Sequence, residues 1–146
     1  MPGRSVWSLT PQQSIEAECA RRGRPAVVDG CAKLIVGEPV DESLIRALGG
    51  PGADKFFDGA QHDDLYWFRV WGARGLLWAW EESATPAILA ALEDESWRVR
   101  EMGLKVIARH LLGDALEAAA ALRDDSVLRV REAARRAVVL LTQAGA

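Results

Sequence analysis

A repeated pattern of five residues constrains the fold of this chain more than any other feature of its sequence. Residues 97–101, Trp-Arg-Val-Arg-Glu, and residues 128–132, Leu-Arg-Val-Arg-Glu, superpose at a shift of 31. A shorter match aligns residues 69–70 with residues 98–99 at a shift of 29. Self-similarity with a period of about 30 residues is typical of chains that stack copies of one supersecondary unit. The sequence therefore predicts a repeat architecture.

Signals for helix starts and ends divide the chain into helical segments. Thr10, Pro11 and Gln13 combine an N-cap, a proline at the first helical position and a capping-box residue. Glycines follow several apolar segments where helices would end, and β-branched residues rarely alternate with polar ones. We therefore expect an N-terminal capping helix over 11–23, a two-helix unit over 25–48, an insert over 49–63, two-helix units over 64–92 and 94–122, and a terminal helix over 126–143.

The strongest copies of the repeat resemble a known family. Residues 94–100, Asp-Glu-Ser-Trp-Arg-Val-Arg, and residues 124–131, Asp-Asp-Ser-Val-Leu-Arg-Val-Arg, each lead into small residues. They resemble HEAT-type repeats, especially the short bacterial kind first described in phycobilisome lyases. The resemblance implies an all-α protein, an α-α superhelix or HEAT-like solenoid. It would hold about three two-helix units, preceded by an N-terminal helix and followed by a final unpaired helix.

Composition limits the number of domains and the cellular setting. A chain of 146 residues with 49% hydrophobic side chains has the size of one domain, expected over 1–146. The net charge of −3 provides no general attraction to nucleic acid or to an anionic membrane. Cys19 and Cys31 form no CxxC motif, and no apolar stretch matches a signal peptide or a membrane span. We expect a cytoplasmic protein.

Arginines recur at one position of the repeat. Arg100 and Arg131 occupy equivalent places in its two strongest copies. The resemblance implies that each bonds an aspartate at the head of its own or the adjacent unit, forming a structural ladder with Asp94 and with Asp124 or Asp125. A basic surface for phosphates is the alternative, but residues 94–146 hold nine basic against eight acidic side chains. The ladder is the favoured interpretation.

Tryptophans are concentrated in the middle of the chain, where five of the six lie between positions 67 and 97. Trp67, Trp71 and Arg74 share one side of a helix at 100° per residue. These indoles could fill the junction with the preceding unit and the insert. Alternatively, together with Trp97 and Arg98 they could form a platform for a peptide or an unpaired base.

No combination of nucleophile, base and orienting group is apparent, so we expect neither an enzyme nor a cofactor. His110 continues an apolar stripe and is interpreted as a core histidine. Residues 62–64, His-Asp-Asp, are interpreted as a helix cap with solvated neighbours, and no metal site is expected.

These features favour a non-catalytic scaffold or adaptor that binds a protein or peptide and no membrane. The alternative is a nucleic-acid-binding protein, because residues 97–100 resemble the Trp-x-x-Arg element of HEAT-like alkylpurine DNA glycosylases. Those enzymes are much longer, no aspartate here matches their catalytic one, and the net charge argues against this function. A third possibility, an auxiliary domain for chromophore or cofactor attachment, follows from family analogy alone.

Overall fold

The computed structural model describes residues 9–145, and all regular secondary structure in this part of the chain is helical. The prediction of an all-α fold is confirmed. The α-helices are α1 (Pro11–Arg22), α2 (Arg24–Ile35), α3 (Glu42–Gly49), α4 (Tyr66–Gly75), α5 (Thr85–Ala91), α6 (Trp97–His110), α7 (Leu116–Ala121) and α8 (Leu128–Gly145). Short 3-10 segments are η2 (Gly50–Phe57), η3 (Glu82–Ala84), η4 (Gly113–Ala115) and η5 (Leu122–Asp124). Of the predicted domain range, residues 1–8 and 146 lie outside the described residues.

The first helix begins where its sequence signals predict. The Thr10 hydroxyl accepts a hydrogen bond from the Gln13 N–H at 3.1 Å, and the Gln13 side chain accepts one from the Thr10 N–H at 2.9 Å. Pro11 occupies the first turn, and Gly23 ends the helix with a positive φ of 91° that favours glycine. Local interactions therefore set both ends of α1.

The helices of the second half recur at a constant spacing. α4, α6 and α8 begin at Tyr66, Trp97 and Leu128, so each start follows the last by 31 (97 − 66 and 128 − 97). The starts of α5 and α7 are also 31 apart (116 − 85). The predicted match of residues 69–70 with residues 98–99 at a shift of 29 is therefore out of register, and Arg69 is the counterpart of Arg100.

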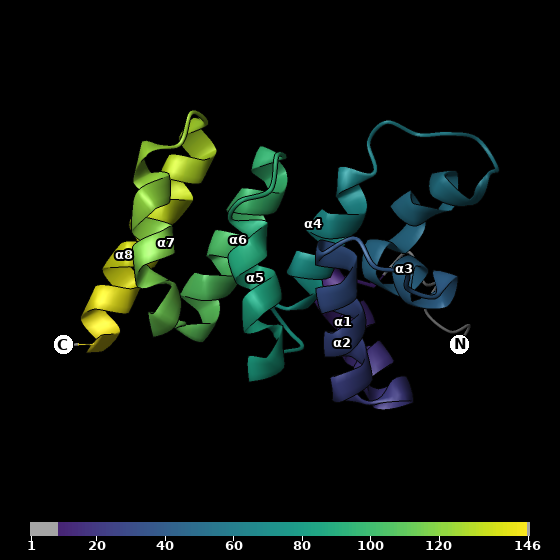
Figure 1. The fold of residues 1–146 in the computed structure, drawn as a ribbon. Coiled ribbons are helices and arrows are strands. Elements are labelled where there is room, and N and C mark those ends of the chain that lie inside the picture. Colours follow the sequence, from purple (N-terminus) through teal and green to yellow (C-terminus); the bar gives the residue numbers. More distant parts are fainter. Residues whose placement is uncertain (1–8, 146) are drawn as a thin grey trace.

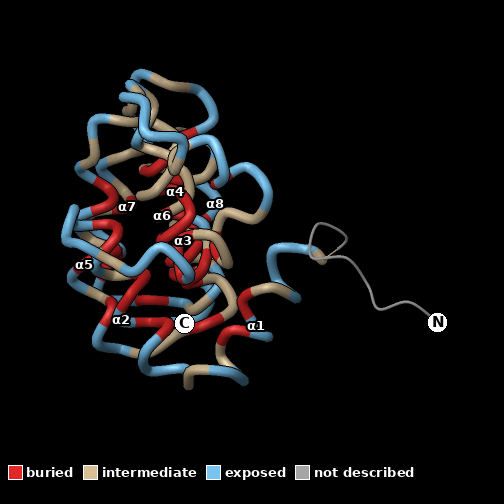
Figure 2. The backbone as a smooth tube through the Cα atoms, turned by 90° about the vertical axis from the view of Figure 1, so that its right-hand side faces the viewer, coloured by how far each residue is buried: buried red, intermediate tan, exposed pale blue. Residues whose placement is uncertain are grey.

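From α4 to α8 the helices follow one another in chain order along the molecule, whereas α3 lies at the end beyond α1 and α2 (Figure 1). α6 packs between α4 and α8, while α5 lies against α6 and α7 against α8. Buried residues gather where these helices face one another, as the tube in Figure 2 shows. The core includes Leu76, Ile88, Leu104, Ile107 and Val130, all with no exposed surface.

Two glycines, one on α4 and one on α6, show which earlier helix packs closely against each of these helices. A Cβ on Gly103 would lie 3.1–3.2 Å from the side chains of Leu92 and Ala91, at the end of α5. A Cβ on Gly72, at the equivalent position of α4, would lie 2.8 Å from the Cys31 carbonyl oxygen of α2. α2 therefore has the place before α4 that α5 has before α6.

This arrangement differs from the predicted unit over 25–48. α2 packs against α1 on one side and against α4 and α5 on the other, whereas α3 packs against α1 and α4. The reason is tertiary, because the close approach at Gly72 brings α4 directly onto the backbone of α2. The interruption between the first helices and α4 thus includes α3 as well as the predicted insert.

The predicted insert over 49–63 contains η2 and packs against α4 through aromatic contacts. The Phe56 ring lies 4.9 Å from the Phe68 ring and 5.7 Å from the Trp71 ring, both edge-on. Arg46 of α3 stacks over Phe57, with its guanidinium carbon 4.6 Å from the ring centroid. These contacts cover one face of α4.

Candidate binding surface

Arginine–aspartate pairs join successive repeats. Arg69 of α4 donates to both carboxylate oxygens of Asp94, through Nε at 2.7 Å and Nη2 at 3.1 Å. Arg100 of α6 donates to Asp125 in the same way, at 2.8 and 3.1 Å. Each pair spans 25 positions of sequence, and each is bidentate, the geometry in which guanidinium and carboxylate bind most strongly.

Of the alternatives that the sequence left open, the structure shows the adjacent unit, with Asp125 rather than Asp124 as the carboxylate partner of Arg100. Arg100 binds the Asp94 of its own unit only at the backbone carbonyl, at 2.8 Å, and Arg131 binds the Asp125 carbonyl in the same way. The residue that pairs with the Arg100 side chain is Asp125, and Asp124 is exposed beside it. The reason is register, because Asp125 is the counterpart of Asp94 in the next repeat.

The carboxylate of Asp125 is stabilised in its charged form. Burial acts to raise the pKa of Asp125. The hydrogen bonds from Arg100 and from the Val127 N–H, with the charges of Arg100 and Arg131, outweigh burial and lower this pKa below its usual value. The ladder is therefore a structural element of the fold.

Of the residues predicted as a binding platform, Trp71 is buried and Arg74 is partly buried. Trp71 is only 6% exposed, and its indole covers Gly49. Arg74 donates through Nη2 to the Leu48 carbonyl at 2.7 Å, and its buried Nε has no hydrogen-bond partner among residues 9–145. Burial lowers the pKa of Arg74. Trp71 is covered and Arg74 is bonded to α3 because α3 and η2 pack against this face of α4, a contact that helical periodicity does not predict.

The other predicted platform residues remain together near the surface. The guanidinium carbon of Arg98 lies 4.5 Å from the Trp97 ring centroid, 5.5 Å from that of Trp67 and 5.6 Å from that of Tyr66. Arg129 approaches Trp97 from α8, at 5.4 Å. We call Tyr66, Trp67, Trp97, Arg98 and Arg129 the aromatic–arginine cluster.

The cluster is a direct product of the repeat period. Tyr66 and Trp97 are the first residues of α4 and α6, and Trp67, Arg98 and Arg129 occupy the next position in α4, α6 and α8. Side-by-side packing of these helices brings the equivalent positions into one row. The sequence-based prediction missed Tyr66 and Arg129, which the shift of 31 would have identified.

Each ring of the cluster is partly exposed and in contact with a cation. Arg129 has 62% of its side chain exposed, and its Nε donates to Glu101 at 2.9 Å. Cations stacked on aromatic faces attract the ring quadrupole and hold the side chains in fixed positions. The cluster therefore offers ordered aromatic surface and guanidinium donors to a ligand.

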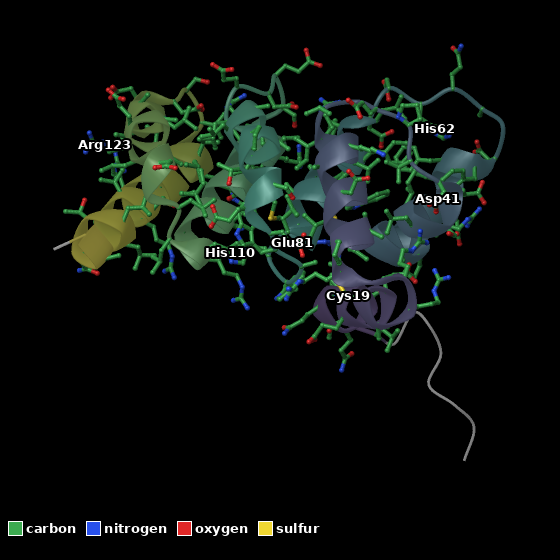
Figure 3. All side chains as sticks on the ribbon, turned by 60° about the horizontal axis from the view of Figure 1, so that its bottom comes forward. Cys19, Asp41, His62, Glu81, His110 and Arg123 are labelled. Atoms are coloured by element: carbon green, nitrogen blue, oxygen red, sulfur yellow. The ribbon has the colours of Figure 1, made fainter. Side chains whose placement is uncertain are left out.

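The two histidines, His62 and His110, lie far from each other (Figure 3). His110 donates through Nε2 to the Leu76 carbonyl oxygen at 2.6 Å and stacks on Trp80 at 4.8 Å. His62 contacts Asp58, with Nε2 at 3.0 Å from Oδ1. Within residues 9–145, no group of three or more His, Cys, Asp or Glu side chains could hold a metal ion.

Comparisons with known proteins identify no relative of this chain. No protein-family model, curated protein or solved structure matches this chain. No helix in the described part of the chain is long and apolar enough to cross a membrane.

Proposed function

We propose that this chain is a non-catalytic HEAT-like solenoid that binds a protein or peptide partner through the aromatic–arginine cluster. The constant spacing of the helix starts and the serial packing of α4, α6 and α8 support the solenoid. The observation that carries the binding function is the cluster itself, in which Arg98 contacts the faces of Trp97, Trp67 and Tyr66 at the surface.

Aromatic and arginine side chains contribute most of the binding energy in many protein interfaces. Here the arginines are already held against the rings, so a partner would immobilise few additional side chains. A rigid surface of this kind loses little conformational entropy on binding. The competing function is base stacking by a nucleic acid on Trp67 and Trp97.

The test compares partners captured by the full chain and by variants of the cluster. Trp97→Ala and Arg98→Ala remove the centre of the cluster, and Arg135→Ala removes an exposed arginine from the middle of α8 as a matched control. Each protein is biotinylated and used as bait in an extract of the source cells, after circular dichroism has shown native helicity. Captured proteins are quantified by mass spectrometry.

We expect a protein whose capture falls at least about tenfold with Trp97→Ala and Arg98→Ala and stays unchanged with Arg135→Ala. Purified partner and chain should then bind each other with the same variant dependence. Two results would contradict the proposal: equal capture by all variants, or retention on duplex DNA that declines steeply with salt and is lost with Trp97→Ala.

A further inference from the structure

A groove of about 710 Å³ lies between α6 and α8, beside the aromatic–arginine cluster. It is continuous with the cluster because Arg129 belongs to both. Its apolar surface is formed by Leu77, Ala108, Ala133 and Leu140, with the fully buried Leu104 beneath them. Its charged surface is formed by Glu101, Lys105, Arg109, Arg129, Glu132 and Arg136.

The charge of this groove is opposite to that of the chain. Among the described residues that line it, four are cationic and two are anionic, which leaves an excess of +2 (4 − 2), while the whole chain carries −3. Arg109 is held in place because its Nε donates to the Leu77 carbonyl at 2.7 Å. Arg136 is exposed and forms no ion pair with any residue of the described part. Lys105 and Arg129 contact Glu101, at 3.9 and 2.9 Å, so Arg109 and Arg136 are the cations best placed for an anionic ligand.

The groove between α5 and α7 has the opposite charge. A second groove, of about 790 Å³, lies between α5 and α7 and is lined by Glu93, Asp114 and Glu117 with no cation among its described lining residues. The excess of positive charge therefore lies in the α6–α8 groove, while the α5–α7 groove is lined by carboxylates. An anionic partner is attracted to the first groove and repelled by the second.

The floor of the groove distinguishes between classes of anionic partner. A continuous phosphate backbone would place charged groups against the apolar floor, where they make no hydrogen bonds. It would also be repelled by the carboxylates of Glu101 and Glu132. An amphipathic peptide with one apolar face and one acidic face matches both the floor and the rim of the groove. Its apolar side chains would cover Ala133 and Leu140, and its carboxylates would pair with cations on the rim.

We infer that the α6–α8 groove binds an acidic amphipathic peptide segment, with apolar side chains on the groove floor and carboxylates against Lys105, Arg109 and Arg136. This inference rests on the proposed function and names the partner class for the surface that adjoins the aromatic–arginine cluster. α6 has 14 residues and is about 21 Å long, so a helical segment of similar length would span the groove.

The probe is a synthetic fluorescent peptide of about 14 residues, with leucines along one helical face and glutamates beside them. Its controls are the same peptide with glutamine in place of glutamate and a single-stranded oligonucleotide of similar charge. Binding to the full chain is measured by fluorescence anisotropy at low and at physiological salt. We expect the glutamate peptide to bind at least about tenfold more tightly than the glutamine peptide and to displace the oligonucleotide.

The groove is tested by charge reversal at adjacent positions of α8. Arg136→Glu places a carboxylate at the rim and should weaken binding of the glutamate peptide about tenfold. Arg135→Glu makes the same change in charge at an exposed neighbour that does not line the groove, and it should leave affinity within about twofold. Both sites are exposed, so both variants should keep native helicity.

Three results would overturn the inference: equal affinity for the glutamate and glutamine peptides, equal weakening by Arg136→Glu and Arg135→Glu, or tighter binding of the oligonucleotide than of the peptide. A partner captured through Trp97 together with no peptide binding would retain the proposed function and reject the acidic groove. Peptide binding that depends on Arg136 but not on Trp97 would support the groove and reject the cluster as the recognition surface.

Discussion

Small residues at one repeated position let the helices approach closely. Gly72, Gly103 and Ala134 occupy equivalent positions of α4, α6 and α8 and are all buried. The nearest atom to a Cβ on Gly72 would be a backbone oxygen of α2, whereas the nearest atoms at Gly103 belong to side chains. The end of the Leu92 side chain can shift by a few tenths of an ångström, but a backbone carbonyl within a helix moves only with that helix.

At the residue scale, Gly72→Ala should therefore destabilise the protein. The new Cβ would lie 2.8 Å from the Cys31 carbonyl oxygen and 3.0 Å from the Leu34 Cβ. Overpacking of this kind costs roughly 1–3 kcal/mol, while alanine gains about 1 kcal/mol in helix propensity. We expect the free energy of unfolding, measured in urea, to fall by about 1 kcal/mol.

Gly103→Ala is the matched control for this position. Its Cβ would meet the Leu92 and Ala91 side chains at 3.1 and 3.2 Å, so the gain in helix propensity should offset most of the strain. Equal losses of stability in the two variants would show that the backbone of α2 does not limit the approach of α4.

At the element scale, the arginine–aspartate pairs fix the N-terminus of one repeated helix to the preceding helix. Asp125 accepts from Arg100 and also from the Val127 N–H at 2.9 Å, at the start of α8. Asp94 accepts from Arg69 and from the Ser96 N–H at 2.8 Å, at the start of α6. One carboxylate thus accepts hydrogen bonds both from a backbone N–H at a helix N-terminus and from the guanidinium of the preceding repeat.

Asp125→Asn should reduce stability at neutral pH and have less effect in acid. Because the folded state lowers the pKa of Asp125 below its usual 3.8, this carboxylate stabilises the fold above that value. The contribution is lost as the pH falls through the lowered pKa. We expect Asp125→Asn to lower the free energy of unfolding by about 1–2 kcal/mol at pH 7, and by less near pH 2–3, in urea titrations.

The neighbouring Asp124→Asn is the control, since Asp124 is exposed and lies outside the ladder. It should change stability by less than about 0.5 kcal/mol. If Asp124→Asn were as destabilising as Asp125→Asn, or if the effect of Asp125→Asn did not depend on pH, the pairing with Arg100 would not be the source of the stability.

At the scale of the whole molecule, each helix pair covers the apolar face of its neighbour, and α8 covers the last one. α8 packs against both α6 and α7 and buries Val130, Ala134, Ala137 and Leu141. Its buried side chains belong to one hydrophobic cluster that extends through the described residues, from Ile15 of α1 to Leu141 of α8. The final helix is therefore part of the stable structure.

A chain that ends after Val127 keeps the Arg100–Asp125 pair and loses α8. Removal of the four buried side chains of α8, with exposure of the surfaces they cover, should cost about 5 kcal/mol. Since small domains are stable by only about 5–15 kcal/mol, we expect a much lower urea midpoint or an unfolded chain by circular dichroism.

A shorter truncation, which removes residues 142–146, is the control. Residues 142–145 are exposed, so their removal should leave the urea midpoint nearly unchanged. A wild-type midpoint in the chain that ends after Val127 would mean that α8 does not stabilise the preceding repeat.

Local signals in the sequence were sufficient to predict the helical class and many helix ends. The capping box at Thr10 and the glycine at position 23 depend only on neighbouring residues, and the structure shows both. The repeat around Trp97 and Leu128 likewise predicted the start of corresponding helices. These features can be predicted from the sequence because helix caps and helical periodicity involve residues within about four positions of each other.

The tertiary structure alone decided which tryptophans and arginines reach the surface. Trp71 and Arg74 share a helical side with Trp67, yet Trp71 is buried and Arg74 binds the Leu48 carbonyl of α3, while Trp67 stays partly exposed beside Arg98. The covering segments are separated from α4 by a loop, and no local pattern indicates where they pack. Likewise, Arg69 could be assigned to Asp94 only once the helices were in register, because that hydrogen bond spans 25 positions and depends on the packing of whole helices.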